Sequence, residues 1–215
     1  MARGSLTSRR ETGAIKKKSK RDRGQEILDA AVDIFHANGY SATTIDDVAN
    51  AVGILKGSLY YYINSKEDLL LRIVEEVHEE VEALMEEAVS RPDATPLERL
   101  AGYVESQVEY NALNVKRVRV YYHDYDQLSP DPLAVVRRRR RAAERKITAL
   151  LKEAKRAGEV PAGLDEKLAS KSIFGSVIWM YTWFKPGGSA SAQAYGSFCA
   201  RFVLAGVRGG TVPVP

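Results

Sequence analysis

Residues 43–70 read TTIDDVANAVGILKGSLYYYINSKEDLL, and this stretch decides how the N-terminal part of the chain is expected to fold. Two short helical patterns flank the tripeptide Val52-Gly53-Ile54, and a longer helix opens at Ser65-Lys66-Glu67-Asp68. Two helices joined by a tight glycine turn form a frame that places one helix in the major groove of DNA. The stretch therefore predicts a DNA-binding helix-turn-helix.

Capping signals support these helix boundaries. Thr43 or Thr44 can cap the first short helix with its hydroxyl group. Gly53 suits the turn because a residue without a side chain tolerates a left-handed backbone. Ser65, with Asp68 three residues later, is a weaker form of the Ser-x-x-Glu capping box, so a helix is expected to begin there.

The remainder of the chain repeats apolar residues at intervals of three and four, which predicts helices throughout. Glycine and proline separate these helices, and no convincing alternating pattern indicates a strand. The first helix of the turn motif begins at Thr43 or Thr44. The other expected helices cover residues 24–38, 55–61, 65–89, 95–110, 115–125, 133–157, 168–184 and 190–207. The prediction is an all-α protein with three short helices followed by about six longer ones.

Charge is unevenly distributed along the 215 residues. The net charge is +4, but residues 1–23 alone hold nine Lys or Arg and two acidic residues. This basic arm could contact phosphates, or it could be a disordered tail that only adds solubility. One cysteine excludes an internal disulfide, and the first residues lack the apolar core of a signal peptide, so a cytoplasmic protein is expected. The longest apolar run, residues 173–184, is too short to span a bilayer, so no membrane partner is expected.

The expected DNA-contacting surface combines the second short helix with two helix N-termini, and consists of Thr44, Lys56, Gly57, Ser58, Tyr60, Tyr61, Tyr62 and Lys66. Lys56 can donate to guanine O6 and N7, and Gly57 lets the helix backbone approach the bases. The three tyrosines point about 100° apart on a helix, so they cannot all be buried, and their hydroxyls could reach phosphates. Thr44 and Lys66 lie at helix N-termini, where backbone N–H groups assist phosphate binding. The alternative is that Leu59 and one tyrosine pack the small domain while the others are merely exposed.

Residues 24–70 resemble the N-terminal DNA-binding domain of TetR-type repressors, without a gap. The matching residues are Ile27-Leu28, Ala30-Ala31, Phe35, Gly39-Tyr40, Thr43-Thr44-Ile45, Val48-Ala49, Val52-Gly53, Gly57-Ser58-Leu59-Tyr60, Ser65-Lys66-Glu67 and Leu69-Leu70. The resemblance implies a homodimer that binds a palindromic double-stranded operator and responds to a small-molecule effector. The expected divisions are a basic disordered arm (1–23), a helix-turn-helix domain (24–70), a ligand-binding and dimerisation domain (71–207) and a flexible tail (208–215).

Two positions depart from the family pattern. Leu55 stands where the family usually has Ser or Thr, so the second short helix lacks a side-chain cap, a loss of about 0.5–2 kcal/mol in other helices. Tyr62-Ile63 stands where His-Phe is common, and Tyr62 can still offer a hydroxyl to a phosphate. These departures leave the predicted fold unchanged and bear only on individual contacts.

Two further motifs narrow the resemblance. Residues 53–60, GILKGSLY, together with residues 183–188, WFKPGG, resemble a TetR subgroup that regulates lipid and steroid breakdown. Several members of that subgroup respond to acyl-CoA thioesters. The resemblance therefore implies an acyl-CoA or a related lipid-derived effector.

The expected effector site draws on aromatic and basic residues of the C-terminal part, namely Tyr103, Tyr110, Tyr121, Tyr122, Arg137, Arg141, Trp179 and Trp183. As a group, the aromatic residues suit a long apolar ligand with a polar end, although each could simply pack the core. The five arginines 137–141 encircle a helix. Two or three could hold the phosphates of CoA, or all could form a solvated rim with Glu144 as a local partner. One histidine among acids at residues 123–126 is a weak metal signal, and no metal is expected.

Taken together, these features predict a ligand-responsive, homodimeric transcriptional repressor rather than an enzyme. No Ser/His/Asp order, Walker loop or dinucleotide-binding glycine motif is present, so no catalytic residue and no cofactor is expected. A repressor of drug efflux with flat cationic ligands is one alternative, and it would place Glu105, Asp124 or Asp126 in the pocket. A small all-α lipid carrier or enzyme is another.

Overall fold

The computed structural model describes residues 20–209, and this part of the chain contains nine α-helices, two short 3-10 helices and no strand. The helices are α1 (Lys20–Asn38), α2 (Ile45–Ala51), α3 (Lys56–Leu59), α4 (Lys66–Val89), α5 (Pro96–Leu113), α6 (Val115–Asp124), α7 (Pro130–Arg156), α8 (Glu166–Ile178) and α9 (Ala192–Gly209). The 3-10 helices are η1 (Tyr125–Gln127) and η2 (Trp179–Thr182). The predicted all-α fold class is confirmed.

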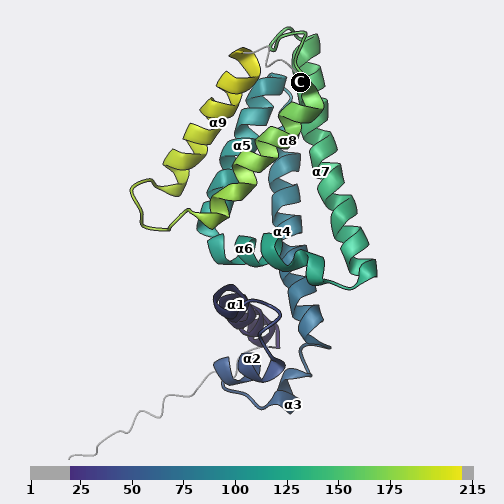
Figure 1. The fold of residues 1–215 in the computed structure, drawn as a ribbon, viewed down its shortest axis with the longest axis vertical. Coiled ribbons are helices and arrows are strands. Elements are labelled where there is room, and N and C mark those ends of the chain that lie inside the picture. Colours follow the sequence, from purple (N-terminus) through teal and green to yellow (C-terminus); the bar gives the residue numbers. More distant parts are fainter. Residues whose placement is uncertain (1–19, 210–215) are drawn as a thin grey trace, which may run out of the picture.

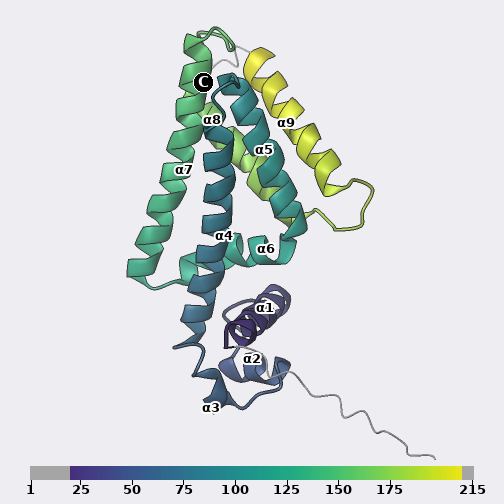
Figure 2. The same ribbon diagram turned by 180° about the vertical axis from the view of Figure 1, so that it is seen from behind.

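The helices form a small unit at one end of the molecule and a larger bundle at the other (Figure 1). Helices α1, α2 and α3 make the small unit, and α4 runs from it into the bundle of α5, α7, α8 and α9. The reverse view shows the same arrangement, with α6 lying across the lower end of the bundle above α1 (Figure 2). α3 therefore lies at the tip of the molecule, and α4 links that tip to the bundle.

Local hydrogen bonds explain why the small unit folds as the sequence predicts. Thr44 caps α2: its Oγ1 accepts from the N–H of Asp47, and the Asp47 carboxylate accepts from the N–H of Thr44 at 2.8 Å. Thr43, the other candidate cap, is buried and donates instead to the carbonyl of Gly39. Gly53 takes a φ of +67°, which is the left-handed conformation that the turn requires.

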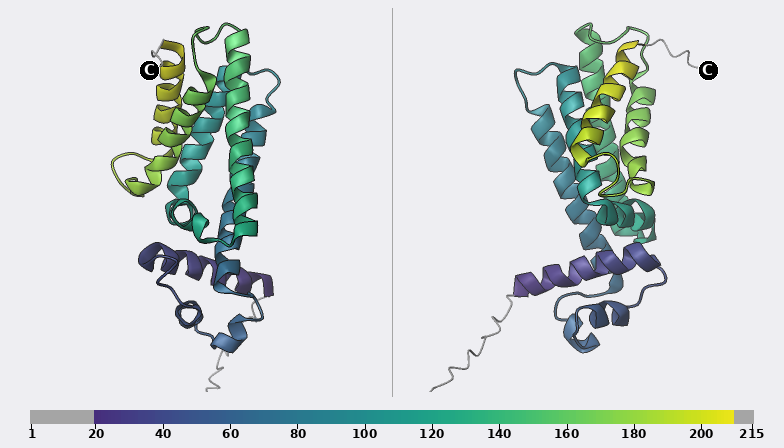
Figure 3. Two further views of the ribbon diagram at one scale, coloured as in Figure 1. Left: turned by 45° about the vertical axis from the view of Figure 1, so that its right-hand side comes forward. Right: turned by 90° about the vertical axis from the view of Figure 1, so that its left-hand side faces the viewer.

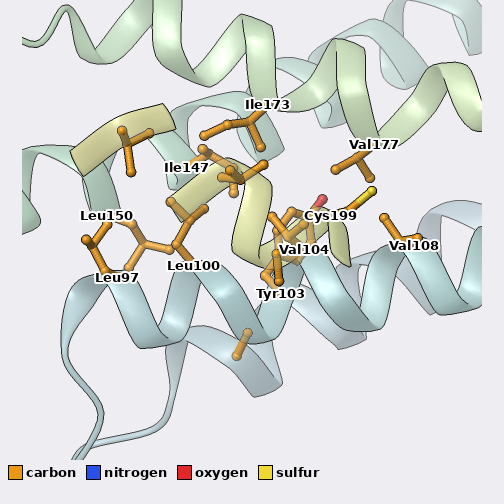
Figure 4. Close-up of a cluster of buried hydrophobic side chains, with 14 of the residues drawn as sticks. Leu97, Leu100, Tyr103, Val104, Val108, Ile147, Leu150, Ile173, Val177 and Cys199 are labelled. Atoms are coloured by element: carbon orange, nitrogen blue, oxygen red, sulfur yellow. The ribbon is translucent and has the colours of Figure 1, made fainter. Parts of the chain in front are cut away.

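Two clusters of buried side chains hold the molecule together, and α4 contributes to both. Its first half places Ile73 and Val74 against α1, while its second half places Met85 in the core of the bundle. In that core, side chains of α5 such as Tyr103 face residues from α7, α8 and α9, which converge on them from several directions (Figure 4). One continuous helix therefore belongs to both cores and joins the small unit to the bundle.

Ion pairs add a second connection between the two units. Arg117 of α6 binds Asp29 of α1 at 3.3 Å and Glu76 of α4 at 2.9 Å. Lys116 of α6 binds Asp33 of α1 at 2.6 Å. The side views show α1 lying across the lower end of α4, directly below α6 (Figure 3). α1 is therefore tied to both α4 and α6.

Several predicted helix ends were wrong. α1 begins at Lys20, so residues 20–23 of the expected arm are helical, and α9 continues to Gly209. α7 begins at Pro130 rather than residue 133, because proline is well suited to the first position of a helix. The single helix expected over residues 168–184 is instead α8 followed by η2. The rest of the expected basic arm, residues 1–19, and the tail residues 210–215 lie outside the described residues.

Candidate DNA-binding and ligand-binding sites

The exposed face of the helix-turn-helix lies on α3 and the residues that follow it. Tyr61 is 79% exposed and Tyr60 49% exposed, and Lys56, Gly57 and Ser58 are also exposed. Leu59 is the one fully buried residue of α3 and fixes it to the small core. The segment thus presents polar and aromatic groups to the outside from a helix of only four residues.

Two features of this face affect how it could meet DNA. The Lys56 ammonium donates to Asp46 of α2 at 2.7 Å, and this hydrogen bond raises the pKa of the lysine. A Cβ atom added to Gly57 would meet nothing within 4 Å, so the surface at Gly57 is open. A flat surface of this kind permits close approach of another backbone or of base edges.

Thr44 and Lys66 are occupied by contacts within the protein. Thr44 forms the cap of α2, and its hydrogen bonds to Asp47 lower the pKa of that carboxyl. The Lys66 ammonium donates to the carbonyls of Tyr40 at 2.9 Å and Thr43 at 2.8 Å, and it lies 4.3 Å from the centre of the Tyr40 ring. Lys66 therefore fastens the α1–α2 loop to the start of α4.

Tyr62 differs from its two tyrosine neighbours. It is half-buried and lines a groove between α1 and α4 with Leu28 and Leu69, while Tyr60 and Tyr61 are exposed. Its departure from the family's common histidine thus places an aromatic ring at the edge of the small core.

A cavity of about 410 Å³ lies inside the bundle, between helices α4, α5, α6, α7 and α8. Five of the eight expected effector-site residues line it: Tyr103, Tyr121, Tyr122, Arg137 and Arg141. The side chains of Val77, Val81, Phe174 and Val177 supply apolar wall. A mainly apolar chamber with a few polar groups is typical of small-molecule sites.

The other three expected residues do not line this cavity. Tyr110 lies on α5 but donates its hydroxyl to Glu80 of α4 at 2.5 Å. Trp179 is 64% exposed, and Trp183 is 50% exposed and packs edge-on against Tyr195 of α9. Trp179 is the first residue of η2 and Trp183 follows its last residue, so both lie beyond the part of α8 that lines the cavity.

A ladder of hydrogen bonds runs along the α5 wall of the cavity. The Tyr103 hydroxyl donates to Gln107 at 3.0 Å, Gln107 donates to Asn111 at 2.9 Å, and Asn111 donates to the carbonyl of Val177 at 3.1 Å. All three side chains are buried, and burial raises the pKa of Tyr103 well above its usual range. Tyr103 and Gln107 are thus fixed polar groups on an otherwise apolar wall.

Helices α4 and α6 carry a second buried polar pair on the cavity wall. His78 of α4 lies with its Nε2 3.2 Å from the Tyr121 hydroxyl and its Nδ1 3.3 Å from the carbonyl of Val74. Burial, together with the nearby charge of Arg139, lowers the pKa of His78 to about 4. The histidine is therefore neutral near pH 7, and it contacts the cavity from the helix that leads to the DNA-binding unit.

Basic side chains gather where the cavity reaches the surface. Arg137 and Arg141 are exposed and line the cavity, and Arg140 lies 4.5 Å from the Tyr125 ring centre and 5.4 Å from that of Tyr122. Arg137 and Arg141 also border an open hollow on α7 that adds Arg138 and Arg145. Arg139 points elsewhere and binds Glu82 at 3.0 Å. Three of the five consecutive arginines therefore face the cavity, and the neighbouring hollow extends the positive surface outward.

Sequence reasoning missed three functional candidates on the cavity wall, namely His78, Gln107 and Lys171, and did not single out Arg140 from the five arginines. The helical spacing of Gln107 from Tyr103, four residues, was a usable signal. No sequence signal indicated His78 or Lys171, because their helices meet only in the folded bundle. Glu144, expected as a partner of the arginines, binds Lys171 at 3.1 Å instead.

Acidic groups and metal ligands are sparse at this site. Glu144 is the single carboxylate on the cavity wall, and Glu105, Asp124 and Asp126 do not line it. Asp124 accepts from Gln127 at 2.7 Å and contacts His123 at 3.0 Å. Within residues 20–209 there is no grouping of three His, Cys, Asp or Glu side chains suited to a metal ion. Over the same residues, every helix is too short or too polar to cross a bilayer.

Comparison with known protein families gives a match to each of the two units. The family profile described as "Tetracyclin repressor-like, C-terminal domain" matches residues 93–207, which is more than half of the chain. The profile described as "Bacterial regulatory proteins, tetR family" matches residues 27–73.

Individual relatives agree with these profiles. The repressor KstR2 of Mycolicibacterium smegmatis is 29% identical over 190 residues, covering 88% of this chain and 91% of that protein. The fatty acid metabolism regulator of Bacillus subtilis is 28% identical over 160 residues, covering 74% of this chain and 82% of that protein.

Solved structures show the same likeness. The ketosteroid transcriptional regulator KstR2 of Mycobacterium tuberculosis aligns with a TM-score of 0.83 at 27% identity, covering 91% of this chain and 98% of that one. AibR, solved in complex with isovaleryl coenzyme A and operator DNA, aligns with a TM-score of 0.71 at 25% identity, covering 86% and 97%. The chain therefore belongs to the TetR family of bacterial transcriptional regulators.

Proposed function

We propose that this protein is a cytoplasmic, homodimeric repressor that leaves a palindromic operator when an acyl-CoA thioester enters its cavity. Membership of the TetR family makes it a DNA-binding transcriptional regulator rather than an enzyme. The observation that carries the choice of effector is the cationic opening of an apolar cavity, formed by Arg137, Arg140 and Arg141.

We assign the proposed functions to successive segments of the chain. Residues 24–70 read the operator, residues 71–207 bind the effector and pair with a second copy, and the basic residues of 1–23 contact phosphates. DNA would meet Lys56, Gly57, Ser58, Tyr60, Tyr61 and Tyr62, while Thr44 and Lys66, whose side chains are engaged within the protein, would hold this surface in position. Because α3 has four residues, one copy can read few base pairs, and two copies would read half-sites about 34–36 Å apart.

Exposed apolar side chains on α8, η2 and α9 support pairing of two copies. Leu168, Trp179, Phe198 and Phe202 are between 47% and 64% exposed in the single chain. Phe198 and Phe202 stack on each other with ring centres 6.2 Å apart, which gives α9 a flat aromatic face. Burial of such a face against its own copy would remove it from water.

Charge and polarity on the cavity wall favour an anionic ligand. Three arginines and Lys171 face one carboxylate, Glu144, so the site is positive where it opens. Forked guanidinium groups bind phosphates with paired hydrogen bonds, and the apolar interior suits an acyl group. The names of the relatives, which refer to ketosteroids, fatty acid metabolism and isovaleryl coenzyme A, support the same class.

The proposed coupling runs through α4 and α6. An acyl group beside His78 and Tyr121 would press on both helices, and each of them is fastened to α1. Movement of α1 would change the separation of the two α3 helices in the dimer. A difference in effector affinity between the two arrangements worth about 1–3 kcal/mol would weaken operator binding roughly 5- to 150-fold.

Control of drug efflux by a cationic aromatic ligand is the second candidate function. A cation would need carboxylates on the wall to offset its charge, and the acids that could have supplied them lie elsewhere. The single cavity carboxylate, Glu144, is already paired with Lys171. The geometry therefore favours the acyl-CoA proposal.

Calorimetry with acyl-CoA, free CoA and the free acid tests this proposal. Acyl-CoA should bind most tightly, because only it fills both the apolar interior and the arginine-lined opening. Arg137→Gln with Arg141→Gln should weaken acyl-CoA binding at least about 10-fold, as expected for loss of two charge-assisted contacts. Lys152→Gln with Arg156→Gln, two exposed residues near the other end of α7, is the matched control. Equal affinity in both double variants would overturn the proposed effector site.

A further inference from the structure

Leu55 has the most exposed large apolar side chain among residues 20–209, at 80%. A single exposed leucine is common on protein surfaces, so its position must carry the argument. It precedes α3 directly, in the part of the small unit that is proposed to enter the major groove. It therefore lies at the N-terminal edge of α3, next to the exposed polar residues Lys56 and Ser58.

The local structure does not explain a leucine at this position. Leu55 is the N-cap residue of α3, and its side chain makes no capping hydrogen bond. Its backbone carbonyl accepts from the N–H groups of Ser58 at 2.9 Å and Leu59 at 3.2 Å, so the backbone is held in place while the side chain projects. A serine there would keep this backbone and add a cap. The leucine thus gives up a capping bond and buries nothing within the chain.

The two residues that follow Leu55 offer little competition for an apolar contact with a base. Lys56 is bound to Asp46, and Gly57 has no side chain. Beside them, Leu55 is a branched apolar group free to approach a base edge. In the major groove, the C5-methyl group of thymine is the apolar feature that distinguishes one base pair from the others.

We propose that Leu55 packs against a thymine C5-methyl group and sets a preference for thymine at one position of each half-site. The inference rests on the proposed docking of α3 in the major groove. It assigns to Leu55 a role in sequence specificity, while the tyrosine hydroxyls hold the phosphates and set the depth of the helix.

Replacement of thymine by deoxyuridine tests the contact because it removes one methyl group and leaves the pairing unchanged. The probe is the duplex that the wild-type protein selects from a random pool, labelled for fluorescence anisotropy. Deoxyuridine should weaken wild-type binding about 4-fold at one thymine of a half-site, and about 15-fold when both half-sites are changed, as expected for loss of one buried methyl contact each. Leu55→Ser, which adds a side-chain cap to α3, should bind the thymine and deoxyuridine duplexes equally.

Leu113→Ala is the matched control, because Leu113 is 76% exposed at the end of α5, far from α3. It should keep the wild-type response to deoxyuridine. The inference would be overturned if the selected duplex contained no thymine whose replacement weakens binding. It would also be overturned if Leu55→Ser lost as much affinity on replacement as the wild-type protein. In both cases the proposed operator binding would stand. Failure of the wild-type protein to retain any duplex would overturn the proposed operator binding as well.

Discussion

The proposed DNA-facing segment and the proposed effector cavity are assembled in opposite ways. The DNA-facing segment is almost continuous in sequence, from Leu55 to Tyr62, and its side chains project outward around one buried anchor, Leu59. The cavity draws its wall from five helices, and residues as distant as His78 and Lys171 meet there. A surface built from one segment depends on local geometry, whereas a chamber built from five helices depends on how those helices pack.

The buried anchor should dominate the stability of the DNA-facing segment. Leu59→Ala removes a fully buried side chain and should lower the free energy of unfolding by about 2–5 kcal/mol. Leu55→Ala, four residues away and exposed, should change it by less than about 0.5 kcal/mol. Urea denaturation of both variants measures the difference. Similar losses of unfolding free energy in Leu59→Ala and Leu55→Ala would contradict this prediction, because the segment would then not depend on one buried anchor.

Lys66 and Lys56, two lysines near the tip of the molecule, test which side chains hold the fold and which are free to contact DNA. Lys66→Met leaves two backbone carbonyls without their charged donor and should cost about 1.5–3 kcal/mol of stability. Lys56→Met breaks only an exposed, solvent-screened ion pair and should cost much less stability than Lys66→Met. Thermal unfolding compares their stability, and anisotropy with the selected duplex compares operator affinity. A larger stability loss for Lys56→Met would contradict these assignments.

The buried histidine makes the stability of the cavity region depend on pH. Burial lowers the pKa of His78 to about 4, below its usual value of 6.5, so the unfolded chain takes up a proton at higher pH than the folded chain. His78 therefore contributes stability that is complete above pH 6.5 and is lost as the pH falls towards 4.

Wild type should accordingly lose about 2 kcal/mol more than His78→Gln between pH 7.5 and pH 4.5, measured by urea denaturation. His123→Gln is the control, because the His123 side chain is 65% exposed. The same pH dependence in wild type and His78→Gln would show that His78 does not remain neutral in the folded protein.

The smallest expected change in stability is that of Gly57→Ala, which tests whether the open surface at Gly57 also faces DNA. The methyl group added by Gly57→Ala would meet nothing within 4 Å, and alanine has a higher helix propensity than glycine. The free energy of unfolding of the isolated protein should therefore rise by up to about 1 kcal/mol. Operator affinity should nevertheless fall, because the added methyl group would stand between α3 and the bases. Gly24→Ala in α1 is equally unobstructed and should leave operator affinity unchanged. Unchanged affinity in Gly57→Ala would remove Gly57 from the DNA-facing surface.

Much of the fold could be predicted because its signals are local. The cap at Thr44, the left-handed turn at Gly53 and the proline at the start of α5 each act over a few residues. The helix ends that were missed, such as the start of α1 and the change to η2, depend on weaker signals. Apolar spacing alone does not distinguish an α-helix from a 3-10 extension of it.

The effector site was only partly predictable. Tyr103, Tyr121 and Tyr122 were correctly expected to gather, but spacing along a helix does not show which neighbour its buried face will meet. Tyr110 turns towards Glu80, and the five arginines divide among the cavity, the outer hollow and Glu82. These outcomes depend on the crossing of α4, α5 and α7.

The sequence by itself determined the all-α class, the helix-turn-helix and the exposed segment after Gly53, because hydrogen bonds and side-chain spacing within a few residues are sufficient to specify them. Only the tertiary structure decided that His78 and Gln107 face a shared cavity, that Lys66 holds a loop, and that three of the five arginines reach the opening. Those features arise where helices distant in sequence pack together, and close packing of side chains between helices selects one arrangement from many that the same helices would allow.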